Sequence, residues 1–278
     1  MREKRKSPAR HVDPYGKRLG DTEDEGDSSD IIEGRNAVLE ALRAGVVIDK
    51  IFIAKGDTDS ALRHIASTAR EAGAVVVDAD RRKLDSMSTT HAHQGVIAQT
   101  ACAEYATIED ILETARRKGE PPLIVLCDEI TDPHNLGAII RTCEAVGAHG
   151  ILIPKRRSVG LTAAVAKTSS GAVYHTSVVR VSNFTSAINE LKKAGVWVFG
   201  ASADGETQLW ESDLTGAAAF VIGSEGAGMR RLVKENCDFC IRIPMFGKIS
   251  SLNASVSAAI LMYEAARQRC ASGRVDKF

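Results

Sequence analysis

The chain has 278 residues with 44% hydrophobic and 26% charged side chains, and its 36 basic residues balance its 36 acidic ones. This length allows two domains, and the composition is that of an ordinary globular protein. No apolar run is long enough to cross a membrane and the basic N-terminus lacks the apolar segment of a secretory signal, so we expect a cytoplasmic protein without a membrane partner.

A charged tail is predicted for residues 1–30. Its first 20 residues are mainly basic and the next ten are mainly acidic, so together they conceal the charge balance of the rest of the chain. With almost no apolar residues, such a segment cannot form a core. The basic half could contact nucleic-acid phosphates, and a solvated tail without a role explains the pattern equally well.

Helical and strand patterns alternate over residues 31–103 and predict a small α/β domain. Charged residues and a Pro-Pro pair then mark residues 104–121 as a linker, which includes a short helix at 108–117. In the small domain, helices are expected at 36–44, 60–72 and 81–87, and strands at 48–54, 74–77 and 95–100.

A larger α/β domain is predicted for residues 122–270, followed by a C-terminal tail at 271–278. Its strands are strongly apolar and separated by helices, which favours a mostly parallel sheet covered on both faces. The strands are expected at 123–130, 150–153, 177–181, 196–201, 218–222 and 239–243.

Polar loops follow three of these strands, and ligands bind at such strand ends in open α/β sheets. The first loop ends at Asn135 and leads into a helix over 136–146, in which Arg141 stands among apolar residues. A solvated helix surface is the structural alternative, but an arginine in an otherwise apolar stretch favours a paired or functional role.

The second loop, residues 223–228, contains three glycines and one carboxylate, Glu225. Its Gly-x-x-Gly-x-Gly order matches neither the dinucleotide fingerprint nor a P-loop, so NAD and ATP are not expected. The third loop places Ser250, Ser251 and Asn253 before a helix of small residues. Helix capping by Ser251 and Asn253, and a surface position for Glu225, are the structural alternatives.

No metal site is expected. Cys237 and Cys240 have the spacing of a ligand pair, but a second pair is missing and Cys240 lies within a strand pattern.

Together the three loops resemble the SpoU/TrmH branch of the SPOUT RNA 2′-O-methyltransferases. The matching segments are residues 135–141 (Asn-Leu-Gly-Ala-Ile-Ile-Arg), 222–228 (Ile-Gly-Ser-Glu-Gly-Ala-Gly) and 243–255, from Ile-Pro-Met to Ser-Leu-Asn-Ala-Ser. Residues 33–42 and 93–98 are similar to the substrate-binding domain of the bacterial 23S rRNA guanosine 2′-O-methyltransferases. This resemblance implies an L30e-like front domain, a SPOUT domain with a deep trefoil knot, and a homodimer.

By the same resemblance, the chain would transfer a methyl group from S-adenosylmethionine to a ribose 2′-hydroxyl, in a guanosine of 23S rRNA. Backbone at Gly223, Ile243 and Leu252 would hold the cofactor. The catalytic set would be Arg141, Asn135, Glu225, Ser251 and Asn253.

Arginine keeps its proton in proteins, so Arg141 is expected to hold a phosphate or to stabilise negative charge on the attacking oxygen. Glu225 is expected to pair with an arginine, and Ser251 and Asn253 to hydrogen-bond ribose or cofactor. The alternatives are a tRNA ribose methyltransferase, a resistance-type rRNA adenosine methyltransferase, a non-catalytic RNA-binding or ribosome-assembly protein, and a nucleotide-dependent oxidoreductase.

Overall fold

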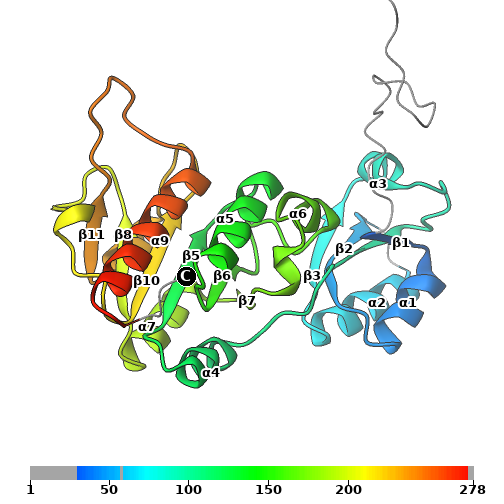
Figure 1. The fold of residues 1–278 in the computed structure, drawn as a ribbon. Helices are drawn as coiled ribbons and strands as arrows, with labels where there is room; N and C mark the ends of the chain where they lie inside the picture. The colour runs from blue at the N-terminus through cyan, green and yellow to red at the C-terminus, as the bar shows by residue number, and fades with distance from the viewer. Residues whose placement is uncertain (1–29, 57–58, 275–278) are drawn as a thin grey trace, which may run out of the picture.

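The computed structural model describes residues 30–56 and 59–274, which fold into two α/β units (Figure 1). The tail predicted for residues 1–30 lies outside the described residues except for Asp30. Of the predicted C-terminal tail at 271–278, residues 271–274 are described. No helix in the described ranges is long and apolar enough to cross a membrane.

The smaller unit has a four-stranded mixed sheet. Its strand order is β1 (Ile31–Glu33), β4 (Val96–Thr100), β2 (Ile48–Ala54) and β3 (Val75–Ala79). Helices α1 (Arg35–Arg43) and α2 (Ser60–Glu71) cover one face, and α3 (Arg81–Met87) covers the other. The predicted helices and strands are present with small shifts at their ends. Strand β1 was not predicted, because three residues are too few to show an alternating pattern.

The larger unit is built on a seven-stranded sheet in which every pairing is parallel, where the sequence predicted a mostly parallel sheet. The strands lie in the order β7 (Val178–Val181), β6 (Gly150–Pro154), β5 (Leu123–Asp128), β10 (Ala218–Gly223), β8 (Trp197–Ala201), β11 (Phe239–Arg242) and β9 (Thr207–Gln208). The short β9 was not predicted.

Helices cover both faces of this sheet, because successive residues of its buried strands point to opposite sides. Helices α5 (Pro133–Ala145), α6 (Ala163–Thr168) and α9 (Ala254–Ala271) pack on one face. Helices α4 (Ile108–Lys118), α7 (Phe184–Lys193) and α8 (Arg231–Glu235) pack on the other. Two 3-10 turns, Ala172–Tyr174 and Leu209–Glu211, complete the described elements.

Part of the segment predicted as a linker belongs to this packing. Ile108, Ile111 and Leu112 of α4 are buried against the sheet, and the Ala106 N–H donates to the Val178 carbonyl oxygen beside β7. The charged residues of α4 face water, and these charges are why the sequence pattern predicted a linker. Residues 104–121 thus include a helical layer of the larger unit rather than forming only a spacer.

The sheet changes winding direction between its adjacent strands β5 and β10. Chain connections run from β5 outward to β6 and β7 on one side, and strands β8, β11 and β9 lie on the other side of β10. At such a switch point the loops after neighbouring strands separate and leave room for a ligand. The loops after β5, β10 and β11 are the three polar loops of the sequence, so the fold brings them to one edge.

Candidate active site

The loop after β5 begins helix α5 with a side-chain cap. The carboxylate of Asp132 accepts a hydrogen bond from the His134 N–H at 2.9 Å, and Pro133 occupies the first turn. Both features favour a helix start at this point. Asn135 follows within the first turn and is 6% exposed, so its amide is held in a fixed position beneath the other loops.

The loop after β10 folds tightly back on itself. The Gly228 N–H donates to the Ser224 carbonyl oxygen at 2.9 Å, and the Ser224 N–H donates to the Gly228 carbonyl oxygen at 3.2 Å. A Cβ atom at Gly223 would lie 2.2 Å from the backbone of Gly228 and Met229. Glycine is therefore required at position 223 by its own chain, and the resulting turn exposes Glu225.

Asn253 caps the third element, helix α9. Its Oδ1 accepts from the N–H groups of Ser255 at 2.9 Å and Val256 at 3.3 Å, and from the Ser255 hydroxyl at 2.6 Å. The capping alternative is thus correct for Asn253. Because the carbonyl oxygen makes all of these bonds, the amide Nδ2 can donate outward from the helix.

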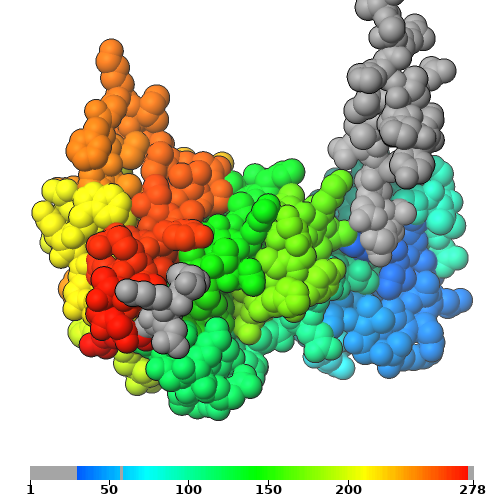
Figure 2. Space-filling view, in the orientation of Figure 1, coloured from blue at the N-terminus to red at the C-terminus, as the bar shows by residue number. Residues whose placement is uncertain are grey.

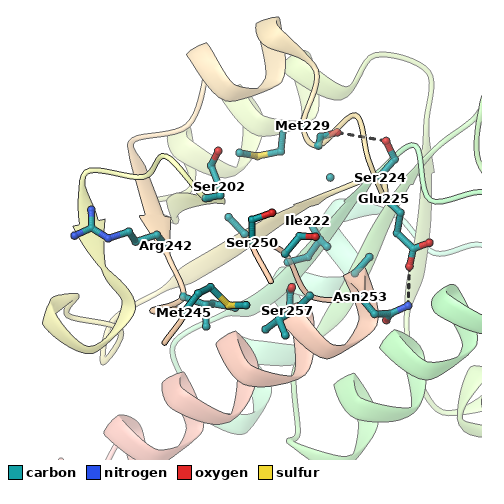
Figure 3. Close-up of a pocket in the computed structure, with 18 of the residues that line it drawn as sticks. Ser202, Ile222, Ser224, Glu225, Met229, Arg242, Met245, Ser250, Asn253 and Ser257 are labelled. Atoms are coloured by element: carbon teal, nitrogen blue, oxygen red, sulfur yellow. Dashed lines mark hydrogen bonds between the residues drawn. The ribbon is translucent and has the colours of Figure 1, made fainter. Parts of the chain in front are cut away.

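The three loops meet in one hydrogen-bonded cluster, formed by Asn135, Glu225 and Asn253. Glu225 Oε1 accepts from Asn135 Nδ2 at 2.9 Å and from Asn253 Nδ2 at 2.6 Å. Asn253 Nδ2 also lies 2.9 Å from Asn135 Oδ1. The bond between Glu225 and Asn253 is drawn in Figure 3. The carboxylate lies at the N-termini of both α5 and α9, where the helix dipoles favour negative charge.

A cavity of about 1070 Å³ opens beside this cluster (Figure 3). Its walls are backbone of the β10 loop, apolar side chains such as Ile222 and Met245, and the start of α9. Polar side chains line it as well, among them Ser202, Ser250 and Ser257, which are labelled in Figure 3.

Most of the sequence-predicted site residues are brought together here. Asn135 lies just behind Glu225 and hydrogen-bonds to it rather than lining the cavity. Glu225 was expected to pair with an arginine. Within the described chain its hydrogen-bond partners are instead the amides of Asn135 and Asn253. The predicted residues that line the cavity are Gly223, Glu225, Ile243, Ser251, Leu252 and Asn253.

Arg141 is separated from this cluster. It lies on α5 six residues after Asn135, which places it about 9 Å along the helix and on another face. Its side chain is exposed, and no described residue forms a hydrogen bond or ion pair with it. The guanidinium is therefore free to bind a group that comes from outside this chain.

Sequence reasoning missed one wall of the cavity. Ser202 and Ala203 follow β8, Gln208 lies in β9, and Met229 ends the β10 loop. The signal was present, because residues 202–205 follow a predicted strand at its carboxyl end as the other three loops do. The loop after β11 is largely exposed, and it stands out from the larger unit in Figure 2.

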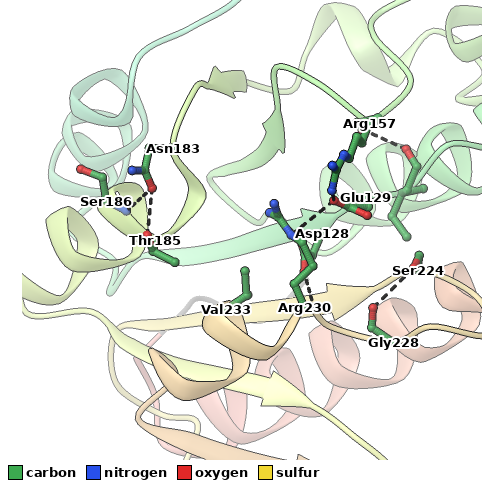
Figure 4. Close-up of polar contacts among 12 residues, drawn as sticks. Asp128, Glu129, Arg157, Asn183, Thr185, Ser186, Ser224, Gly228, Arg230 and Val233 are labelled. Atoms are coloured by element: carbon green, nitrogen blue, oxygen red, sulfur yellow. Dashed lines mark hydrogen bonds and ion pairs between the residues drawn. The ribbon is translucent and has the colours of Figure 1, made fainter.

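A buried ion pair anchors the far end of the β10 loop. Asp128, at the end of β5, is fully buried and accepts from Arg230 Nε and from the Arg230 N–H, both at 2.8 Å. Figure 4 shows this contact and the neighbouring Glu129, which pairs with Arg157. The loop is thus fixed at Gly223 by close packing and at Arg230 by charge.

None of the described residues form a group of three or more His, Cys, Asp and Glu side chains placed to hold a metal ion. Cys237 and Cys240 lie near the β11 edge as free thiols. Burial raises the pKa of the Cys237 thiol to about 12.

Comparison with known proteins gives matches over both units. The model of the SpoU rRNA Methylase family matches residues 122–263, and a model described as RNA 2′-O ribose methyltransferase substrate binding matches residues 31–106. YacO of Bacillus subtilis, assigned to the TrmH family of tRNA/rRNA methyltransferases, is 47% identical over 240 residues, which are 86% of this chain and 96% of that protein.

Solved structures share the fold. The SpoU methyltransferase AviRb from Streptomyces viridochromogenes, solved in complex with the cofactor AdoMet, aligns with a TM-score of 0.55 at 24% identity, over 87% of this chain and 90% of its own. The TrmH/SpoU tRNA modifying enzyme of A. aeolicus aligns with a TM-score of 0.50 at 30% identity, over 60% of this chain and 86% of its own.

Proposed function

Because the chain belongs to the SpoU rRNA Methylase family, we propose that it transfers a methyl group from S-adenosylmethionine to a ribose 2′-hydroxyl of RNA, in a guanosine of 23S rRNA. The observation that carries this proposal is the Asn135–Glu225–Asn253 cluster, which joins three separate loops at the rim of one cavity. We also propose that it acts in the cytoplasm, where such RNA is found.

The cavity suits a nucleoside cofactor. Its volume of about 1070 Å³ is slightly above the ~300–1,000 Å³ typical of ligand pockets, so cofactor and target ribose could share it. We assign backbone at Gly223, Ile243 and Leu252 to hold the cofactor, with Ile222 as an apolar wall for a base. When bound, S-adenosylmethionine supplies a methyl group that is already electrophilic, so the protein must mainly align the reactants and assist proton removal.

Glu225 is proposed to hydrogen-bond a hydroxyl group of the ligand and so to help align the reactants. Both amide donors use Oε1, so within the described chain Oε2 accepts no hydrogen bond and is available to a ligand hydroxyl. The two donors also fix the carboxylate before the ligand arrives, which removes the cost of ordering it on binding. Ser251 lines the same cavity and could accept or donate a hydrogen bond to ribose.

Arg141 is proposed to bind the phosphate next to the target ribose, or the developing negative charge on its oxygen. Its guanidinium is exposed and without a partner in the described chain, and it offers paired donors to phosphate oxygens. Arg141→Ala is expected to abolish methyl transfer and leave cofactor affinity within about twofold. Arg141→Lys keeps the charge without the planar fork and is expected to recover only part of the activity. Near-normal turnover of Arg141→Ala would contradict the proposal that Arg141 binds this phosphate or oxygen.

The first test of the function is transfer of labelled methyl to RNA from cells that lack the modification. Ribosomal RNA and tRNA are assayed in parallel, and the product is mapped. Label at a ribose of 23S rRNA is the expected result. Label on tRNA alone would mean that the substrate is tRNA and not 23S rRNA, while the methyl-transfer reaction stays as proposed. The likeness to the A. aeolicus tRNA modifying enzyme makes this outcome worth testing. Cofactor binding without transfer to either RNA would favour a non-catalytic protein.

We further propose that the protein is a homodimer. Val256 and Tyr263 lie seven residues apart on one face of α9 and are 46% and 54% exposed. Exposed apolar groups on a helix that borders the site are typical of a surface covered by another chain. Sedimentation velocity should give twice the chain mass, and Tyr263→Glu should lower it. The deep trefoil knot implied by the SPOUT resemblance stays a prediction.

A further inference from the structure

The two units meet at a buried charged contact. Asp49 of β2 is 1% exposed and accepts from Arg180 of β7 at 2.5 Å and from the Tyr105 hydroxyl at 2.6 Å. Arg180 also stacks over the Tyr105 ring, 4.3 Å from its centre. A Cβ atom at Gly160 would lie 1.8 Å from Asp49 Oδ2, so the junction is closely packed. The charge of Asp49 is therefore already balanced by Arg180.

Four more cations lie around this junction. Lys50 follows Asp49 in β2, Lys83 lies in α3, and Lys155 and Arg156 come directly after β6. Within the described ranges none of the four lies within ion-pair distance of a carboxylate. Lys50 Nζ instead reaches across the junction to the Ser158 carbonyl oxygen at 3.4 Å.

These cations repel one another. Burial lowers the pKa of Lys50, and the charges of Arg180 and Lys83 lower it further, although Asp49 acts in the opposite direction. Burial also lowers the pKa of Lys155, with added repulsion from Arg180 and Arg156. The cations of the two units are thus close enough to interact through Arg180, and Asp49, the acidic group that acts on Lys50, already pairs with Arg180.

These cations lead toward the cavity. Lys155 and Arg156 stand at the carboxyl end of β6, which pairs in parallel with β5, and the β5 loop carries Asn135. Arg157 beside them reaches Glu129 at the end of β5, as Figure 4 shows. In Figure 2 the smaller unit, in blue, lies against the yellow-green part of the larger unit.

We propose that Lys50, Lys83, Lys155 and Arg156 form a phosphate track that carries the backbone of the substrate RNA from the smaller unit across the junction toward the cavity. This inference rests on the proposed function, because it takes RNA as the substrate. A single small anion could neutralise only part of a series contributed by two units, whereas successive phosphates of one strand can meet each cation in turn.

The test measures RNA affinity against salt concentration for Lys155→Gln/Arg156→Gln and for Lys50→Gln/Lys83→Gln. The matched control is Arg117→Gln/Lys193→Gln, which removes two exposed cations at the C-terminal ends of α4 and α7, on the opposite edge of the sheet. Each track variant should reduce the slope of log affinity against log salt by about 1.4, since each lost phosphate contact contributes ~0.7. The KM for RNA should rise about tenfold, with kcat and cofactor affinity unchanged.

The outcomes separate the inference from the proposed function. If the wild-type protein methylates RNA and both track variants behave like the control, the track is wrong and the function stands. If only one of the two double variants weakened RNA binding, the phosphates would contact one unit alone, and the proposal that the RNA backbone crosses the junction would be wrong. If the wild-type protein neither binds nor methylates RNA, the proposed function fails and the inference with it. Melting temperatures near that of the wild type would show that the variants are folded.

Discussion

The ion pair between Asp128 and Arg230 should be the main anchor of the glycine-rich loop. Asp128 is fully buried, so removing Arg230 leaves a buried carboxylate with only the backbone N–H of residue 230 as a partner. Breaking a buried pair in this way costs about 3–5 kcal/mol. The Arg230 side chain is 40% exposed, so water can replace part of its contact, and about 3 kcal/mol is expected for Arg230→Ala.

This loss should be visible as a drop in melting temperature of roughly 6–12 °C, from ~2–4 °C per kcal/mol for a unit of this size. Arg231→Ala is the matched control, because Arg231 is 80% exposed and pairs only with Glu235 one turn on. Such a surface pair contributes about 0.5 kcal/mol or less. Cofactor affinity should fall in Arg230→Ala and not in Arg231→Ala, since only the first releases the loop.

A second substitution distinguishes the effect of the unpaired Asp128 charge from the effect of losing the packing of the Arg230 side chain. Asp128→Asn in the Arg230→Ala background removes the unpaired charge and should recover part of the lost stability. Equal melting temperatures for Arg230→Ala and Arg231→Ala would refute the reasoning. A second refuting result would be that adding Asp128→Asn to Arg230→Ala lowers the stability as much as an unrelated substitution at a buried site would, because the two effects would then be independent.

Three further predictions concern single residues. Asn253→Ala removes the cap of α9 and one donor to the carboxylate, and should cost about 1 kcal/mol in urea unfolding and weaken cofactor binding in calorimetry. Gly223→Ala places a Cβ atom 2.2 Å from the backbone of Gly228, so it should lower cofactor affinity at least tenfold in the same assay, whereas Gly216→Ala, with nothing within 4 Å, should not. Burial lowers the pKa of His149 from 6.5 to about 4, and its Nδ1 accepts from the Leu123 N–H, so the neutral ring is the folded form. The unfolded chain binds the proton more readily, so this stabilisation is complete above pH 6.5 and is lost as the pH falls toward 4. The melting temperature of His149→Gln should therefore depend less on pH between 5 and ~7 than that of the wild type, and equal slopes would contradict the assignment.

The sequence was sufficient for the main architecture because the buried strands are nearly continuous apolar runs. It could also locate the three polar loops, since each follows such a strand. That Asn135 bonds to Glu225 was not predictable, because the pairing depends on sheet order, and β5 and β10 are neighbours only in space. The helix α4 was assigned to a linker because its exposed charges concealed the buried Ile108 and Ile111.

For Gly223 the structure adds a reason that the sequence did not give. The family resemblance assigned its backbone to the cofactor, and the structure shows that a Cβ atom there would clash with the backbone of Gly228 and Met229. The family resemblance placed Arg141 in one catalytic set with Asn135. Six residues of helix turn Arg141 to another face, so membership of one sequence motif did not predict a shared position.

The carboxylate shared by α5 and α9 couples the site to the folding of the larger unit. Its partners lie 90 and 28 residues from it along the chain, and the two asparagines are 118 residues apart. Contacts of such sequence separation form late, because the intervening chain must first be ordered. No short fragment of the unit could hold the cluster, so a ligand that needs it binds only the folded chain and stabilises that state in proportion to the logarithm of its concentration. The cofactor would therefore stabilise only the chain in which the sheet is complete, and the rise in melting temperature that it causes would report its affinity for that folded state.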